Sequence, residues 1–155
     1  VYKRQADINE ILCRLTRGRK YATLVAAEWN STNDTLTWVS AGHPPLMLRR
    51  NGSIRDYGAT GRPIGLLSDQ SYESERAELA EGDTVLLFTD GLLEAGGLSG
   101  SDEFGLDRIR TCLSVDGSPR TVIERLTAAL AAHIDGDEPE DDVTLVCIRR
   151  KVTNR

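Results

Sequence analysis

The sequence lacks any recognisable cysteine pattern. Cys13, Cys112 and Cys147 are odd in number and widely spaced, and no CxxC motif occurs. This argues against a disulfide framework and against a structural zinc site. We therefore expect reduced, mostly buried thiols, which favours a cytoplasmic protein.

Long apolar runs and a basic field are also lacking. No apolar run approaches the roughly 18 residues that a membrane helix needs, and no signal peptide is visible. The net charge of -5 leaves no broad positive surface for nucleic acid. The 155 residues, 39% hydrophobic and 28% charged, suit one globular domain with a sizeable core.

Helical periodicity occurs in separate stretches of the chain. Ile8, Ile11, Leu12 and Leu15 give residues 6–17 one apolar face. A helical turn is predicted at 92–95 and a helix at 106–113. Another helix, with Ser118 as its N-cap and a proline at its first position, runs to about residue 133.

Strand-like segments fill most of the remaining sequence. They are predicted at residues 21–29, 35–41, 46–50, 53–57, 72–79, 84–89 and 143–149. The first two form a long antiparallel hairpin, and the segment 46–50 resumes the second strand after a break at 42–45. Residues 96–101 are glycine-rich and predicted to be a mobile loop. This order of elements predicts an α+β layered domain, in which helices pack outside antiparallel sheet.

Acidic residues adjoin two strongly apolar strands. Asp90-Gly91 follows the strand 84–89, and Asp141-Asp142 precede the strand 143–149. Carboxylates at the ends of adjacent strands would repel each other unless a cation lay between them, and hard divalent cations prefer oxygen ligands. The alternatives are an ordinary turn at Asp90 and a solvated acidic loop over 135–142.

Other polar residues have weaker claims to a chemical role. His43 could be catalytic, but we favour a corner where the strand bends. His133, near a helix C-terminus, is assigned no role. Arg62, between Gly61 and Pro63, could face an anion such as phosphate or could be an exposed arginine of a turn. Cys13 is a weak candidate nucleophile because no histidine lies near it in the sequence.

Four segments taken in order resemble a known family. They are Ser40-Ala41-Gly42-His43-Pro44-Pro45, Gly61-Arg62-Pro63-Ile64-Gly65-Leu66, the run from Glu81 to Gly91, and Asp141-Asp142-Val143-Thr144-Leu145. Over residues 6–150 the chain resembles the SpoIIE/RsbU branch of the PPM (protein phosphatase 2C-like) serine/threonine phosphatases. The resemblance implies a PPM-type α-β-β-α sandwich of antiparallel sheets with flanking helices. It also implies hydrolysis of phosphoserine or phosphothreonine on a protein by a metal-activated water.

The resemblance also assigns roles to residues of this sequence. The family's catalytic, metal-binding aspartates fall on Asp90 and Asp141, which would bind Mn²⁺ or Mg²⁺. Asp142 and Gly91 would support the site, and Arg62 is a candidate for the phosphate side. The implied partner is a phosphorylated regulatory protein, such as an anti-sigma-factor antagonist in bacteria. An upstream sensor domain or a homodimer of the parent protein is compatible with this branch.

The sequence departs from the family pattern at its start. Two acidic motifs that normally come first, a Gly-Asp ending an early strand and an Asp-x-x-Gly-His-Gly loop, are not in this chain. We therefore expect the N-terminal part of the fold to be missing, with a two-metal site only in the full-length domain. Residues 1–5 need not be native, residues 6–150 would be a partial domain, and 151–155 a tail.

Two hypotheses follow from this departure. The chain is either a truncated piece of an active phosphatase, weak or inactive alone, or a shortened paralogue. Such a paralogue would be a catalytically inactive module that binds a phosphoprotein or a regulatory partner. We favour truncation because Asp90 and Asp141 are both present.

Overall fold

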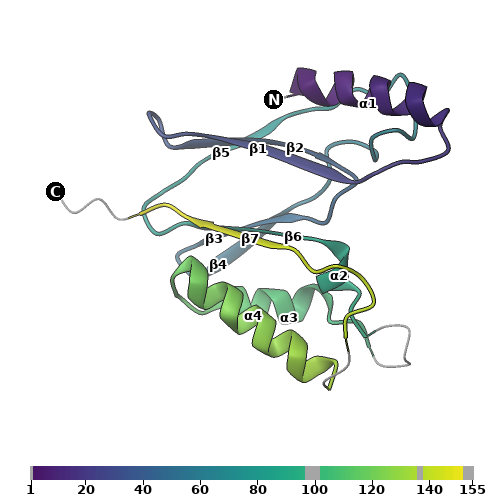
Figure 1. Cartoon of the computed structure of the whole chain (residues 1–155). Coiled ribbons are helices and arrows are strands. Elements are labelled where there is room, and N and C mark those ends of the chain that lie inside the picture. Colours follow the sequence, from purple (N-terminus) through teal and green to yellow (C-terminus); the bar gives the residue numbers. More distant parts are fainter. Residues whose placement is uncertain (1, 97–101, 136–137, 152–155) are drawn as a thin grey trace. The chain divides into compact units, whose positions relative to one another are not determined.

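The computed structural model describes residues 2–96, 102–135 and 138–151 (Figure 1). They form two compact units: the first unit comprises residues 1–43 and 58–79, and the second comprises 44–57 and the chain from residue 80 onward. Each unit is an antiparallel sheet that carries helices, which confirms the predicted class. Apart from Gly96, the loop predicted at 96–101 lies outside the described residues. Within the described ranges, no helix is long and apolar enough to cross a membrane.

The first unit contains α1 (Tyr2–Thr16) and a sheet of β1 (Leu24–Asn30), β2 (Thr35–Ala41) and β5 (Glu75–Glu78) in the order β1-β2-β5. β1 and β2 form the predicted hairpin, in register from Leu24 opposite Ala41 to Asn30 opposite Thr35. β1 begins later than predicted because Ala22 pairs with Ile64 instead, through two backbone hydrogen bonds of 2.9 Å. Helix α1 lies along one face of this sheet (Figure 1).

The buried face of α1 shares only Leu12 with the apolar face that the sequence predicts; Leu12 is partly buried against a cluster that includes Val39 and Ile64. Ile8, Ile11 and Leu15 are 43%, 47% and 76% exposed, whereas Gln5 and Asn9 are 2% and 0% exposed. Asn9 explains the difference, because its amide satisfies backbone groups of the loop that follows β4 in sequence. Its Nδ2 donates to the carbonyl oxygens of Leu67 and Ser68 at 2.8 and 3.2 Å, and its Oδ1 accepts from the Gly65 amide at 2.8 Å.

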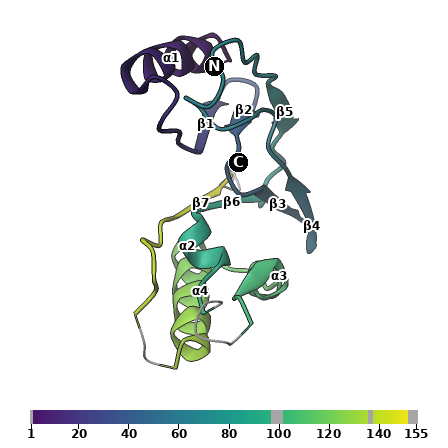
Figure 2. The same cartoon turned by 90° about the vertical axis from the view of Figure 1, so that its right-hand side faces the viewer.

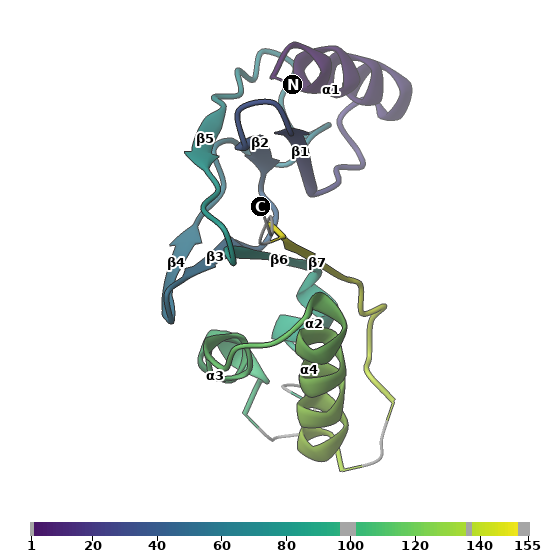
Figure 3. The same cartoon turned by 90° about the vertical axis from the view of Figure 1, so that its left-hand side faces the viewer.

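The second unit contains a four-stranded sheet in the order β4-β3-β6-β7. Its strands are β3 (Leu46–Arg50), β4 (Ser53–Tyr57), β6 (Thr84–Phe88) and β7 (Leu145–Arg149), and its helices are α2 (Asp90–Leu93), α3 (Gly105–Ser114) and α4 (Pro119–His133). Helices α3 and α4 cover one face of this sheet (Figures 2 and 3). The predicted N-cap is confirmed, since Ser118 Oγ accepts from the Thr121 amide at 3.2 Å.

One strand prediction is wrong. β3 does not resume β2 but belongs to the other sheet. The chain leaves β2 at Gly42, whose φ of +66° suits glycine because it has no Cβ. The break at 42–45 is thus the connection between two sheets, which local sequence cannot distinguish from a bend within one strand.

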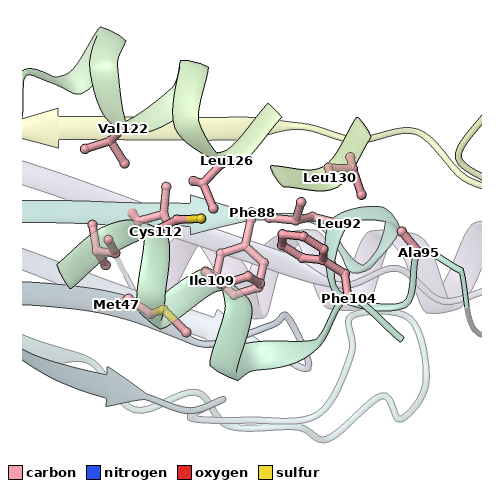
Figure 4. Packing of buried hydrophobic residues seen from close by; sticks show 12 residues of the cluster. Met47, Phe88, Leu92, Ala95, Phe104, Ile109, Cys112, Val122, Leu126 and Leu130 are labelled. Carbon is pink, nitrogen blue, oxygen red and sulfur yellow. The ribbon is translucent and has the colours of Figure 1, made fainter. Parts of the chain in front are cut away.

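A continuous apolar cluster joins the helices of the second unit to its sheet (Figure 4). Its buried members are Met47, Leu86, Phe88, Leu92, Ala95, Phe104, Ile109, Cys112, Leu113, Val122, Leu126 and Leu130. The three cysteines are free thiols, of which Cys112 is buried and Cys13 and Cys147 are half-buried, and burial raises the pKa of the Cys147 thiol to about 11. This cluster fixes the sheet end that carries Asp90.

We predict that Asn9→Ala lowers the free energy of unfolding by about 1–3 kcal/mol, because it leaves the Gly65 amide and two carbonyl groups without their partner. Chemical denaturation would measure this. Glu10→Ala, at an exposed position of the same helix, is the matched control. Equal stability of the two variants would contradict the anchoring role of Asn9.

Candidate active site

The structure brings Asp90 and Asp141 to the same end of two neighbouring strands. β6 and β7 pair antiparallel, with Phe88 opposite Leu145 at the end of the ladder. The pairing continues by one more bond, from the Thr89 amide to the Thr144 carbonyl oxygen at 3.1 Å. Asp90 follows on one strand, and Asp141-Asp142 precede on the other. The sequence predicted that these two strands are adjacent, which the pairing confirms, and β7 is an edge strand of the described sheet.

Thr89 ties the two acidic segments together through its side chain. Its hydroxyl accepts from the Thr144 amide at 2.9 Å and donates to the Asp142 carbonyl oxygen at 3.0 Å. Thr89 stands at the N-cap of α2 but makes no side-chain cap bond, because the hydroxyl is used across the strands. One residue therefore fixes the backbone of Asp142 next to the start of α2.

Gly91 allows a close approach of the two segments. A methyl group at this position would lie 2.6 Å from the Asp142 carbonyl oxygen and 3.0 Å from that of Asp141. Real Cβ atoms do not approach oxygen this closely, so any larger residue must push the strand ends apart. Gly91 therefore allows the start of α2 to pack against the backbone of Asp141 and Asp142, and its supporting role in the site stays a prediction.

The carboxylates of Asp90 and Asp141 each accept a hydrogen bond from the amide of the next residue. Asp90 Oδ1 accepts from the Gly91 amide at 3.2 Å, and Asp141 Oδ1 accepts from the Asp142 amide at 2.8 Å. Asp90 is half-buried, whereas Asp141 and Asp142 are exposed. No arginine or lysine in the described part of the chain forms an ion pair with any of the three. Within those residues, their negative charge is therefore not balanced by a neighbouring cation.

The donor set has the right chemistry for Mn²⁺ or Mg²⁺ but is small. Carboxylate oxygens are the ligands these hard cations prefer. Within residues 2–96, 102–135 and 138–151, however, no group of three histidine, cysteine, aspartate or glutamate side chains is placed to hold a metal ion. Asp90 and Asp141 can therefore supply part of a coordination shell.

Asp83, a third motif aspartate, has a structural role that the sequence did not reveal. Its side chain is 2% exposed and accepts from Arg50 Nε at 2.9 Å and from Arg50 Nη2 at 2.5 Å. It also accepts from the Ala80 amide at 2.8 Å. Asp83 therefore holds the turn before β6 and fixes the start of the strand that ends at Asp90.

Arg62 and His43 belong to the first unit, so the structure does not assign them to the acidic end. Arg62 is exposed. His43 Nδ1 lies 3.2 Å from Thr23 Oγ1, and the preceding Gly42 packs against Pro63. The favoured interpretation of His43 as a corner residue fits this contact. The position of Arg62 on the phosphate side stays a prediction.

Two antiparallel sheets, each with its own helix or helices, are the architecture of PP2C-type phosphatase domains. Comparison with known proteins agrees. Residues 5–151 match the model of the Stage II sporulation protein E (SpoIIE) family, and the chain belongs to that family.

Individual relatives support this classification. The chain is 26% identical over 152 residues to the phosphoserine phosphatase RsbU of Bacillus subtilis, covering 94% of this chain and 44% of RsbU. It matches the Bacillus subtilis SpoIIE phosphatase domain, presoaked with Mn, at a TM-score of 0.70 and 18% identity, covering 95% of this chain and 66% of that one. The RsbU and RsbW domains of a Mycobacterium tuberculosis protein match at a TM-score of 0.69 and 27% identity, covering 94% and 42%. The chain spans less than half the length of the curated relatives it matches.

We predict that Gly91→Ala destabilises the second unit by about 1–3 kcal/mol, because the new methyl group overlaps the backbone of Asp141 and Asp142. Denaturant titration would measure the loss. Gly58→Ala is the control, since a methyl group there meets no atom within 4 Å. If both variants unfold at the same denaturant concentration, a methyl group at residue 91 does not disturb the backbone of Asp141 and Asp142, and the prediction is contradicted.

Proposed function

We propose that this chain is the part of a protein serine/threonine phosphatase that contributes Asp90 and Asp141 to the active site. The observation that carries the proposal is the set of contacts that holds the end of β6 against the segment before β7. Thr89 and Gly91 hold the two aspartate-bearing segments in backbone contact. Two acidic segments held together in this way, without a balancing cation among the described residues, form a suitable partial site for a divalent metal ion.

The proposed metal ligands are Asp90 and Asp141, with Mn²⁺ or Mg²⁺ as the cation. When bound, such an ion supplies an activated water and offsets charge on the phosphoryl oxygens. Asp142 supports the site through its backbone, since its carbonyl oxygen accepts the Thr89 hydroxyl. The remaining ligands would come from outside the described residues.

The proposed substrate is phosphoserine or phosphothreonine on a regulatory protein, such as an anti-sigma-factor antagonist. This proposal is supported by the match between 94% of this chain and RsbU, a phosphoserine phosphatase. Arg62 is proposed to face the phosphorylated segment, because guanidinium groups pair well with phosphate.

A second candidate function is a module that binds a phosphoprotein without hydrolysing it. The observation that favours it is the small donor set, since the described residues gather no group of three ligands. The two candidates differ in one measurable respect, which is turnover that depends on Mn²⁺ or Mg²⁺.

We predict that Asp90→Asn and Asp141→Asn in the complete gene product each abolish Mn²⁺-dependent hydrolysis of a phosphorylated protein while leaving the fold intact. Each change removes a charged oxygen ligand, so Mn²⁺ affinity should also fall by at least about tenfold. Phosphate release and calorimetric titration with Mn²⁺ measure the two effects, and circular dichroism reports the fold.

Glu138→Gln is the matched control because Glu138 is an exposed acid of the loop before Asp141. It should retain the activity of the unchanged protein. Full turnover by Asp90→Asn would sink the phosphatase assignment. An unchanged protein that binds a phosphoprotein but never releases phosphate would instead establish the binding module.

A further inference from the structure

Thr89 uses its side chain where a regular strand would use its backbone. The Thr89 amide donates to the Thr144 carbonyl oxygen at 3.1 Å, as in an antiparallel ladder. The return bond of such a pair would run from the Thr144 amide to the Thr89 carbonyl oxygen. That oxygen instead accepts from the Leu92 amide at 3.1 Å, because α2 begins here. The Thr144 amide donates to the Thr89 hydroxyl, at 2.9 Å, in its place.

The same hydroxyl holds the acidic segment 138–142. It donates to the Asp142 carbonyl oxygen at 3.0 Å. Among the residues that the structure describes, this is the only hydrogen bond that joins 138–142 to another part of the chain. The bond from the Asp142 amide to Asp141 Oδ1 lies within the segment, and Asp141 is exposed. The hydrogen bonds that locate Asp141 therefore run through Asp142 to Thr89.

Asp90 has a support of its own. It is the first residue of α2, and its carbonyl oxygen accepts from the Glu94 amide at 2.8 Å. Two residues later, Leu92 is 0% exposed and lies in the apolar cluster of the second unit (Figure 4). None of these contacts uses the Thr89 hydroxyl. The two aspartates thus differ in what holds them, although both lie at the same end of paired strands.

We propose that Thr89 is a positioning residue of the proposed metal site, which acts through Asp141 and not through Asp90. This inference rests on the proposed function, because it concerns the same divalent cation. Residues that orient metal ligands by hydrogen bonds contribute to metal affinity without contacting the metal. In this role the hydroxyl keeps the backbone that carries Asp141 beside the start of α2.

An ordinary helix cap does not account for Thr89. A threonine at an N-cap commonly accepts a hydrogen bond from an amide of the first turn, but Thr89 makes no such bond with α2. A contribution to stability alone is the remaining alternative. It differs from positioning in one respect, because its effect on metal affinity would not depend on which of Asp90 and Asp141 is present.

The test is a double-mutant cycle on Mn²⁺ affinity in the complete gene product, measured by calorimetric titration. We expect Thr89→Val to weaken Mn²⁺ binding about tenfold. This loss should vanish in the Asp141→Asn background and persist in the Asp90→Asn background. Thr89→Ser keeps the hydroxyl and should bind Mn²⁺ as the unchanged protein does. Thr127→Val is the control, because the Thr127 hydroxyl bonds only within α4, to the Ile123 carbonyl oxygen.

A second measurement needs no metal. In the metal-free protein, hydrogen exchange of the Thr144 amide is followed by nuclear magnetic resonance. It should be faster in Thr89→Val than in Thr89→Ser or the unchanged protein, because the acceptor of this amide is lost. Equal exchange in the three proteins would overturn the inference.

Equal losses of Mn²⁺ affinity from Thr89→Val in the two asparagine backgrounds would also overturn it, since they would indicate a general effect on stability. So would a loss in Thr127→Val as large as that in Thr89→Val. An unchanged protein that binds no Mn²⁺ would contradict the proposed function, and this inference with it. If Thr89→Val does not fold, as judged by circular dichroism, Thr89→Ala is compared with Thr89→Ser under the same criteria.

Discussion

The candidate active site depends on the hydroxyl group of Thr89. This single atom accepts a hydrogen bond from one backbone group of the neighbouring segment and donates to another. A valine of the same shape could fill the space but could do neither. The hydroxyl therefore continues the β6–β7 pairing beyond the last ladder pair. It makes the position of Asp142, and with it that of Asp141, depend on the position of Asp90.

The opposite end of β6 is held just as firmly. Asp83 binds Arg50 through its side chain, and its carbonyl oxygen accepts from the Arg150 amide at 3.0 Å. β6 and β7 are thus tied at both ends, which prevents a slip of register. A slip by one residue would turn every side chain to the other face and separate the two aspartate segments. This explains why one motif contains a buried structural aspartate at its start and an accessible one at its end.

The sequence predicted what depends on short segments and missed what depends on long-range contacts. The apolar run before Asp90 and the run after Asp142 were sufficient to predict two paired strands with acidic ends. The buried face of α1 could not be predicted, because Asn9 is satisfied by backbone groups such as the Leu67 carbonyl oxygen, 58 residues away. The change of sheet at Gly42 could not be predicted either, because the same turn residues can lead to a strand of the same sheet or to a strand of another sheet. Asp83 looks like an ordinary turn residue in the sequence because its partner, Arg50, is also remote.

The charge of the acidic end sets a condition on the proposed phosphatase role. Asp90, Asp141 and Asp142 are negative and have no basic partner among the described residues, so alone they would repel a phosphorylated substrate. In the proposed hydrolysis, a divalent cation held by these carboxylates would offset their charge and activate a water molecule.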